Sequence, residues 1–147
     1  RAGLTLAGAL ISGGRHADAV LQLSALGPEA PSPADAARAE LERARALCRL
    51  GRYDETIALS RRCRENAQTI GALEVEVRSL LNLGGALLDM RRNQEAEGAL
   101  REALELSARA GYLYGEAAAC VNLGNIAFFE DRFEEAADGF QRQGDKG

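Results

Sequence analysis

The sequence predicts an all-α protein built from about four antiparallel helix pairs, and three observations support that fold class. A motif recurs after forty residues, because Asn82-Leu-Gly-Gly returns as Asn122-Leu-Gly-Asn. The chain is 46% hydrophobic with no Trp, and Ala and Leu dominate that fraction, which favours helix over strand. The three prolines all lie within residues 28–33, so the rest of the chain has no obligatory helix breaker.

The repeat extends to the turns between helices. Gly51-Arg-Tyr, Arg91-Arg-Asn and Asp131-Arg-Phe are spaced at forty residues, and Gly14-Arg-His fits the same frame 37 residues before Gly51. A period of this length indicates stacked structural units. We therefore expect one repeat domain over residues 1–147, forming part of a longer array, with units at approximately 1–30, 34–70, 72–110 and 113–147.

The first unit and the start of the second are marked by apolar spacing and a helix cap. Leu4, Ala7, Gly8 and Ile11 share one helical face and predict a helix over 4–12, and a second stripe predicts one over 16–26. The Pro-rich stretch then interrupts the pattern. Ser32 is suited to N-cap the next helix, with Pro33 at its first position, and this helix is expected over 34–50.

The remaining elements follow from the turns. Gly51 ends the helix at 34–50, and Gly71 and Gly111 are suited to cap the C-termini of two more with a positive φ. The expected helices lie at 53–69, 72–90, 93–110, 113–130 and 133–143. Gly144 resembles the same closing glycine but arrives seven residues before the frame requires it, which predicts a last helix that is short or incomplete.

Glycines inside the predicted helices have a packing explanation. Gly84 and Gly124 lie mid-helix, where Gly costs about 1 kcal/mol relative to Ala. Gly8 and Ala44 occupy the same place in the other units. We expect these small residues to let the second helix of each pair approach closely.

Charge and hydropathy bear on the class of partner. The net charge of −4 argues against a nucleic-acid binder driven by phosphate neutralisation. Residues 37–70 carry +3 and residues 71–147 carry −6, an asymmetry that fits either solvated helix faces or the orientation of a partner. No apolar run approaches the ~20 residues that cross a bilayer, so no membrane association is expected.

The sequence offers no constellation for catalysis. Cys48, Cys63 and Cys120 are widely spaced without a C-x-x-C motif, which indicates buried thiols in a reducing compartment rather than disulfides. His16 has no ligand or triad partner at a suitable spacing. The Gly-rich stretches contain no Lys-Ser/Thr pair for phosphate. We therefore expect no enzyme activity, no metal and no cofactor.

These motifs resemble the tetratricopeptide repeat. The first-helix pattern appears as Leu80…Leu83-Gly84…Leu87 and Cys120…Leu123-Gly124…Ala127, and the second-helix opening as Gly51-Arg-Tyr and Asp131-Arg-Phe. The resemblance implies a right-handed superhelix whose first helices line a concave groove. The 40-residue period is similar to that of LGN/Pins-type scaffolds, which hold extended peptides, and of the sensor region of MalT-like bacterial regulators.

The resemblance also implies which residues face the groove. In the LGN/Pins-like pattern an Arg and an Asn four residues later do so. Arg78 and Asn82 match this pair, Arg38 matches with Glu42 replacing the Asn, and Asn122 matches with Ala118 replacing the Arg. The expected peptide-binding residues are Arg38, Arg45, Arg49, Arg78, Asn82, Asp89, Asn122, Asn125 and Phe129.

Two interpretations of these side chains remain. Asn suits the backbone of an extended ligand, since it offers a donor and an acceptor, and Arg suits carboxylates. Alternatively, the asparagines cap or bridge neighbouring helices and the arginines are solvated.

The sequence thus predicts a cytoplasmic scaffold for protein–protein interaction that binds an extended or helical peptide segment in the groove. A second hypothesis is a ligand-sensing regulatory module of a larger signalling ATPase or transcription regulator. A third is a structural role with end-to-end self-association of the array.

Overall fold

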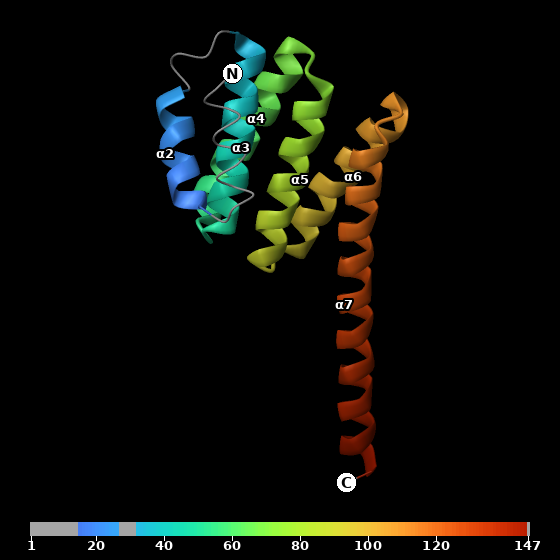
Figure 1. The fold of residues 1–147 in the computed structure, drawn as a ribbon. Coiled ribbons are helices and arrows are strands. Elements are labelled where there is room, and N and C mark those ends of the chain that lie inside the picture. The colour runs from blue at the N-terminus through green and yellow to red at the C-terminus, as the bar shows by residue number, and fades with distance from the viewer. Residues whose placement is uncertain (1–14, 27–31, 147) are drawn as a thin grey trace.

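The described part of the chain is helical throughout. In the computed structural model the described residues are 15–26 and 32–146. They form helices, and those after residue 32 are joined by short turns (Figure 1). The helices are α2 (His16–Leu26), α3 (Pro33–Arg49), α4 (Tyr53–Ile70), α5 (Leu73–Asp89), α6 (Asn93–Ala110) and α7 (Leu113–Lys146). The predicted all-α class is therefore confirmed, and the helices expected between residues 16 and 110 begin and end within one residue of their predicted bounds. The helix expected at 4–12 lies outside the described residues.

The predicted caps form where the sequence indicates them. The Ser32 hydroxyl accepts a hydrogen bond from the Asp35 amide at 3.1 Å, with Pro33 in the first turn of α3. Gly71 and Gly111 end α4 and α6 with φ angles of 71° and 68°, in the left-handed region that glycine adopts at little cost. These caps fix where α3 begins and where α4 and α6 end.

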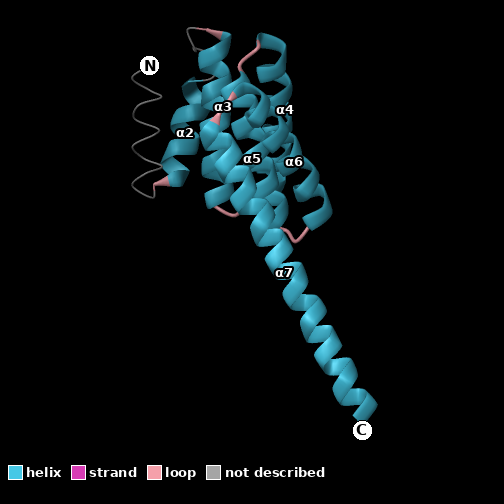
Figure 2. Ribbon diagram, turned by 90° about the vertical axis from the view of Figure 1, so that its right-hand side faces the viewer, coloured by secondary structure: helices cyan, strands magenta, loops and turns pink. Residues whose placement is uncertain are grey.

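Successive helices pack in antiparallel pairs that form two layers. Helices α3, α5 and the first half of α7 make one layer, while α4 and α6 lie on its outer side (Figure 2). The central apolar cluster joins α5, α6 and α7 through buried residues such as Leu80, Leu87, Leu100 and Ile126. The outer layer is linked by ion pairs from α4 to α6, namely Arg61 to Glu95 at 3.9 Å and Arg64 to Glu102.

The helix-pairing role predicted for the mid-helix glycines holds at Gly84 and fails at Gly124. A Cβ on Gly84 would stand 2.7 Å from Leu100 Cδ2 of α6, so the two helices meet closely there. Ala44 is buried at the equivalent place in α3. A Cβ on Gly124 would meet nothing within 4 Å, since no described helix folds back against α7 at that point. Gly8 lies outside the described residues.

The expectation of a fourth helix pair at 113–130 and 133–143 is wrong. Helix α7 continues for 34 residues through Asp131 and Arg132 without a turn, and its second half extends beyond the other helices (Figure 1). The described side chains after Ile126 are all exposed. The physical reason is that burial against a neighbouring helix must offset the cost of a turn, and no described residue of this stretch is buried.

Candidate functional site

A cavity of about 1330 Å³ lies along the inner faces of α3, α5 and α7. Helices α3 and α5 are each the first member of a pair, and the start of α7 takes the same place in the repeat, so equivalent faces lie side by side. We call this surface the groove. Its lining mixes polar, charged and apolar side chains.

Most of the predicted site residues come together in the groove. Arg45 and Arg49 line it from α3, and Asn122, Asn125 and Phe129 line it from α7, with the rest contributed by α5. Arg38 does not line it; its guanidinium instead forms an ion pair with Glu74 at 3.5 Å. The eight predicted residues that line the groove are Arg45, Arg49, Arg78, Asn82, Asp89, Asn122, Asn125 and Phe129.

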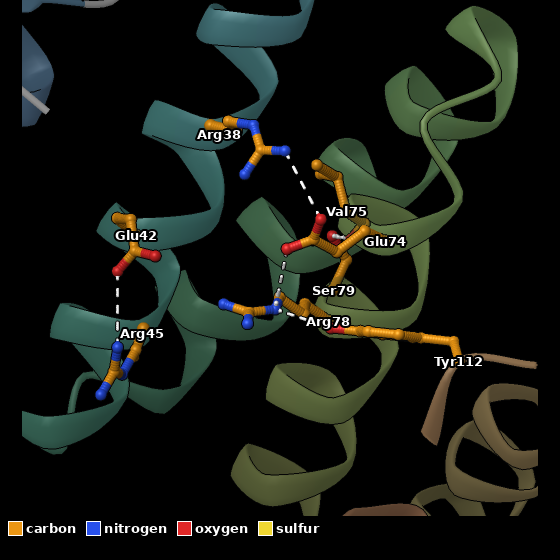
Figure 3. Close-up of polar contacts among 8 residues, drawn as sticks. All are labelled: Arg38, Glu42, Arg45, Glu74, Val75, Arg78, Ser79 and Tyr112. Atoms are coloured by element: carbon orange, nitrogen blue, oxygen red, sulfur yellow. Dashed lines mark hydrogen bonds and ion pairs between the residues drawn. The ribbon is translucent and has the colours of Figure 1, made fainter. Parts of the chain in front are cut away.

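Arg78 is held by contacts within the protein. Its Nε lies 3.1 Å from the Tyr112 hydroxyl and 3.5 Å from Glu74 Oε1, and its guanidinium stacks 4.9 Å from the centre of the Tyr114 ring. Figure 3 shows Arg38 and Arg78 converging on Glu74 from neighbouring helices. Partial burial alone would lower the pKa of Arg78, but the hydrogen bond to Tyr112 and the nearby negative charge raise it above its ordinary value. The side chain is therefore a fixed cation in the groove wall.

The asparagines divide between structural and open positions. Asn82 Nδ2 donates to the Leu41 carbonyl at 3.3 Å and so bridges α5 to α3, as the alternative interpretation of the sequence expected. Asn122 is partly buried and Asn125 is exposed, and neither side chain hydrogen-bonds to another described residue. Asn122 and Asn125 thus offer donors and acceptors to a ligand.

Three other groove arginines are less constrained than Arg78. Arg45 makes an exposed ion pair with Glu42 at 3.7 Å, one helical turn away (Figure 3). Within the part of the chain that the structure describes, Arg49 and Arg91 form no ion pair. Exposed guanidinium groups of this kind bind carboxylates with two parallel hydrogen bonds when a ligand supplies them.

Asp89 sets the electrostatics at the end of α5. Burial, followed by the negative charge of Asp89, raises the pKa of the Cys48 thiol above its ordinary value. The same carboxylate raises the pKa of the Tyr53 phenol, chiefly through its charge. Cys48 lines the groove as a protonated, weakly nucleophilic thiol.

Sequence reasoning missed Tyr114, Arg91 and Ile126, which also line the groove. Tyr114 lies one turn before Ala118 and two before Asn122, so the i, i+4, i+8 spacing of the recognised positions could have identified it. Arg91 had no such signal, because it lies in a turn and reaches the groove through a left-handed backbone with φ of 60°.

Other classes of site have no support in the described residues. No group of three or more His, Cys, Asp or Glu side chains among them could hold a metal ion. No described helix combines the length and hydropathy needed to cross a bilayer.

Comparison with known proteins agrees with the helix pairs. A search among curated proteins finds no match for the chain. The sequence profile of the tetratricopeptide repeat matches residues 35–109, which is the segment that contains α3, α4, α5 and nearly all of α6. The matched region covers half of the chain and coincides with its best-packed helix pairs, so this protein belongs to the tetratricopeptide repeat family.

Proposed function

We propose that this protein binds a peptide segment of a partner protein in the groove formed by α3, α5 and α7. Repeats of this family are generally modules for protein–protein interaction. The observation that carries the proposal is the combination of side chains left open on one concave surface. Asn125 and Phe129 present a hydrogen-bonding group and an aromatic ring from the same face of α7.

Shape and chemistry both suit a segment of polypeptide. The groove is lined by three neighbouring helices, and its amide side chains match the donors and acceptors of a peptide backbone. Aromatic rings and arginines are the side chains that most often dominate binding energy at protein interfaces.

Phe128 and Phe129 provide a matched test. Their rings are similarly exposed, at 56% and 58%, and they are adjacent in α7, but of the two only Phe129 lines the groove. A random peptide library displayed on phage is panned on the immobilised protein. Binding of the enriched peptides is then measured for the wild type, Phe129→Ala and Phe128→Ala by fluorescence anisotropy.

We expect Phe129→Ala to weaken binding about tenfold or more, the loss typical of an aromatic anchor at an interface, and Phe128→Ala to leave it within about twofold. Both variants should retain the helical circular dichroism and melting temperature of the wild type, because both rings are mostly exposed. Equal effects of the two substitutions, or no enriched peptide, would show that the groove is not the binding surface.

A further inference from the structure

We infer that the segment bound by the groove is acidic, with its carboxylates paired to Arg45, Arg49 and Arg91 and an apolar side chain against α7. This inference rests on the proposed function and specifies the chemistry of the partner. Three observations support it: the charge of the groove, the backbone conformation of Arg91, and the difference between the two walls.

The groove is positive within a negative protein. Its lining contains four arginines and two carboxylates, a net charge of +2, whereas the whole chain carries −4. Arg78 is already engaged by Glu74 and Tyr112. The other three arginines are available, because Arg45 has only its exposed contact with Glu42, and Arg49 and Arg91 have no ion pair with a described residue. Cations gathered on a concave surface attract and orient an anionic partner.

Arg91 occupies a backbone conformation that favours glycine. Gly51 holds the equivalent position in the turn of the preceding repeat, forty residues earlier. The two turns have equivalent hydrogen bonds, from Gly51 N to Cys48 O at 3.0 Å and from Arg91 N to Leu88 O at 2.9 Å. The φ angles are 77° and 60°. A β-carbon is disfavoured in this region, so arginine costs free energy here that glycine would not. Strain of this kind occurs at functional positions, and the strained residue carries its charge into the groove.

The two walls of the groove differ in character. The α3 wall and the end of α5 carry Arg45, Arg49 and Arg91, which outnumber the two carboxylates on the same side, Glu42 and Asp89. The groove-lining residues of α7 are all uncharged: Tyr114, Ala118, Asn122, Asn125, Ile126 and Phe129. A segment that satisfies both walls therefore has carboxylates on one side and an apolar residue on the other. A nucleic acid would place phosphates against the arginines too. Its evenly spaced charges would, however, also face the uncharged α7 wall of a chain whose net charge is −4, whereas a short peptide needs carboxylates only where the arginines lie.

The experiment uses the displayed random library on the whole chain and scores the composition of the enriched peptides. We expect Asp and Glu to be enriched together with at least one large apolar residue. Binding of such a peptide should weaken with increasing ionic strength, because salt screens exposed charges. Arg49→Glu should reduce affinity on the order of tenfold or more, since it replaces attraction with repulsion. Arg109→Glu, near the end of α6 and outside the groove, is the matched control.

Arg91→Gly separates a binding role from a structural one. The substitution removes the charge and the strain together, so we expect affinity for the acidic peptide to fall on the order of threefold to tenfold while the melting temperature rises. A residue with only a structural role would not lower affinity as it raised stability. Unchanged affinity in both Arg91→Gly and Arg49→Glu would overturn the inference.

The outcomes also distinguish this inference from the proposed function. Enriched peptides that are neutral or basic, yet depend on Phe129, would overturn the acidic partner and leave peptide binding in the groove intact. Peptides that do not depend on Phe129 would overturn both. A single-stranded oligonucleotide that binds more tightly than the acidic peptides, and displaces them, would identify the partner as nucleic acid and overturn the inference.

Discussion

Leu100 occupies the space that a side chain on Gly84 would need, with its Cδ2 2.7 Å from the position of a Cβ. Gly84→Ala would therefore force Leu100, which is fully buried, to move within the central cluster. We expect the free energy of unfolding to fall by about 1–3 kcal/mol, the usual effect of overpacking a core. Urea denaturation followed by circular dichroism measures it.

Gly124→Ala is the control for that prediction, because it makes the same change at the equivalent place of α7. Nothing lies within 4 Å of its Cβ position, so only the helix propensity changes, and the free energy of unfolding should rise by up to about 1 kcal/mol. Destabilisation by Gly124→Ala would indicate that another element packs against this face in solution.

Gly115 and Ser107 form a second close contact, between the start of α7 and the end of α6. A Cβ on Gly115 would overlap Ser107 Oγ, and this buried hydroxyl has no hydrogen-bond partner among the described residues. We expect Gly115→Ala to lower the free energy of unfolding by about 1–3 kcal/mol and Ser107→Ala to be nearly neutral.

The double variant should be more stable than the single Gly115→Ala variant, because removing the hydroxyl relieves the closest contact of the new methyl group. The contacts with Val77 Cγ1 at 2.7 Å and Tyr112 Cδ1 at 2.8 Å remain in both variants. A double-mutant cycle in urea measures this coupling. Strictly additive effects would contradict the contact.

Gly51 and Arg91 both have a positive φ, so the free-energy cost of a side chain in this conformation can be measured by adding one at Gly51 and removing one at Arg91. Gly51→Ala should lower the free energy of unfolding by about 1 kcal/mol, and Arg91→Gly should raise it by a similar amount. Space is not a factor at Gly51, since a Cβ there would meet no atom within 4 Å. Melting temperatures that shift in the same direction for both variants would contradict this account.

Cys48 provides a prediction for pH dependence. Burial and the charge of Asp89 raise the pKa of its thiol, so less thiolate forms at any pH below that value and alkylation requires a higher pH than for an unperturbed thiol. The prediction that the thiols are buried is wrong for Cys120, which is exposed on α7. At pH 8 we therefore expect iodoacetamide to modify Cys120 first and the buried Cys63 last. Mass spectrometry of time points resolves the three sites.

Asp89→Asn isolates the electrostatic contribution to Cys48. Removing the negative charge lowers the pKa of the thiol, so alkylation of Cys48 at pH 8 should become faster while that of Cys63 stays the same. An unchanged rate at Cys48 would mean that burial alone controls the thiol.

The fold was predictable from the sequence wherever a local signal and the packing agree. Ser32, Gly71 and Gly111 are chemically suited to the ends at which they lie, so those helix boundaries follow from the sequence. Neither Arg91 nor Asp131 is the glycine that usually ends a helix at such a turn. Of these two positions, the chain turns at Arg91 and continues as helix through Asp131. After Arg91, α6 buries Ala96 and its neighbours against α5, and this burial offsets the strain. The residues around each turn do not indicate whether the following helix will be buried against a neighbour.

The groove was predictable as a surface but less so in its details. Helical periodicity places Arg45 of α3 and Asn122 and Phe129 of α7 on equivalent faces of their helices, and the structure brings them to one cavity. Periodicity could not show that Asn82 donates a hydrogen bond to the Leu41 carbonyl or that Arg38 forms an ion pair with Glu74. Both interactions depend on the distance between neighbouring helices.

The equal lengths of α3 and α5 bound the size of the ligand segment. Each has 17 residues and is therefore about 26 Å long at 1.5 Å per residue. A fully extended segment that runs beside them advances about 3.3 Å per residue, so about eight of its residues meet the walls. A segment that crosses from α3 to α7 passes two interhelical spacings of about 10 Å and meets about six. On our proposal that the groove binds a peptide, either direction would accommodate a short linear motif of one partner chain.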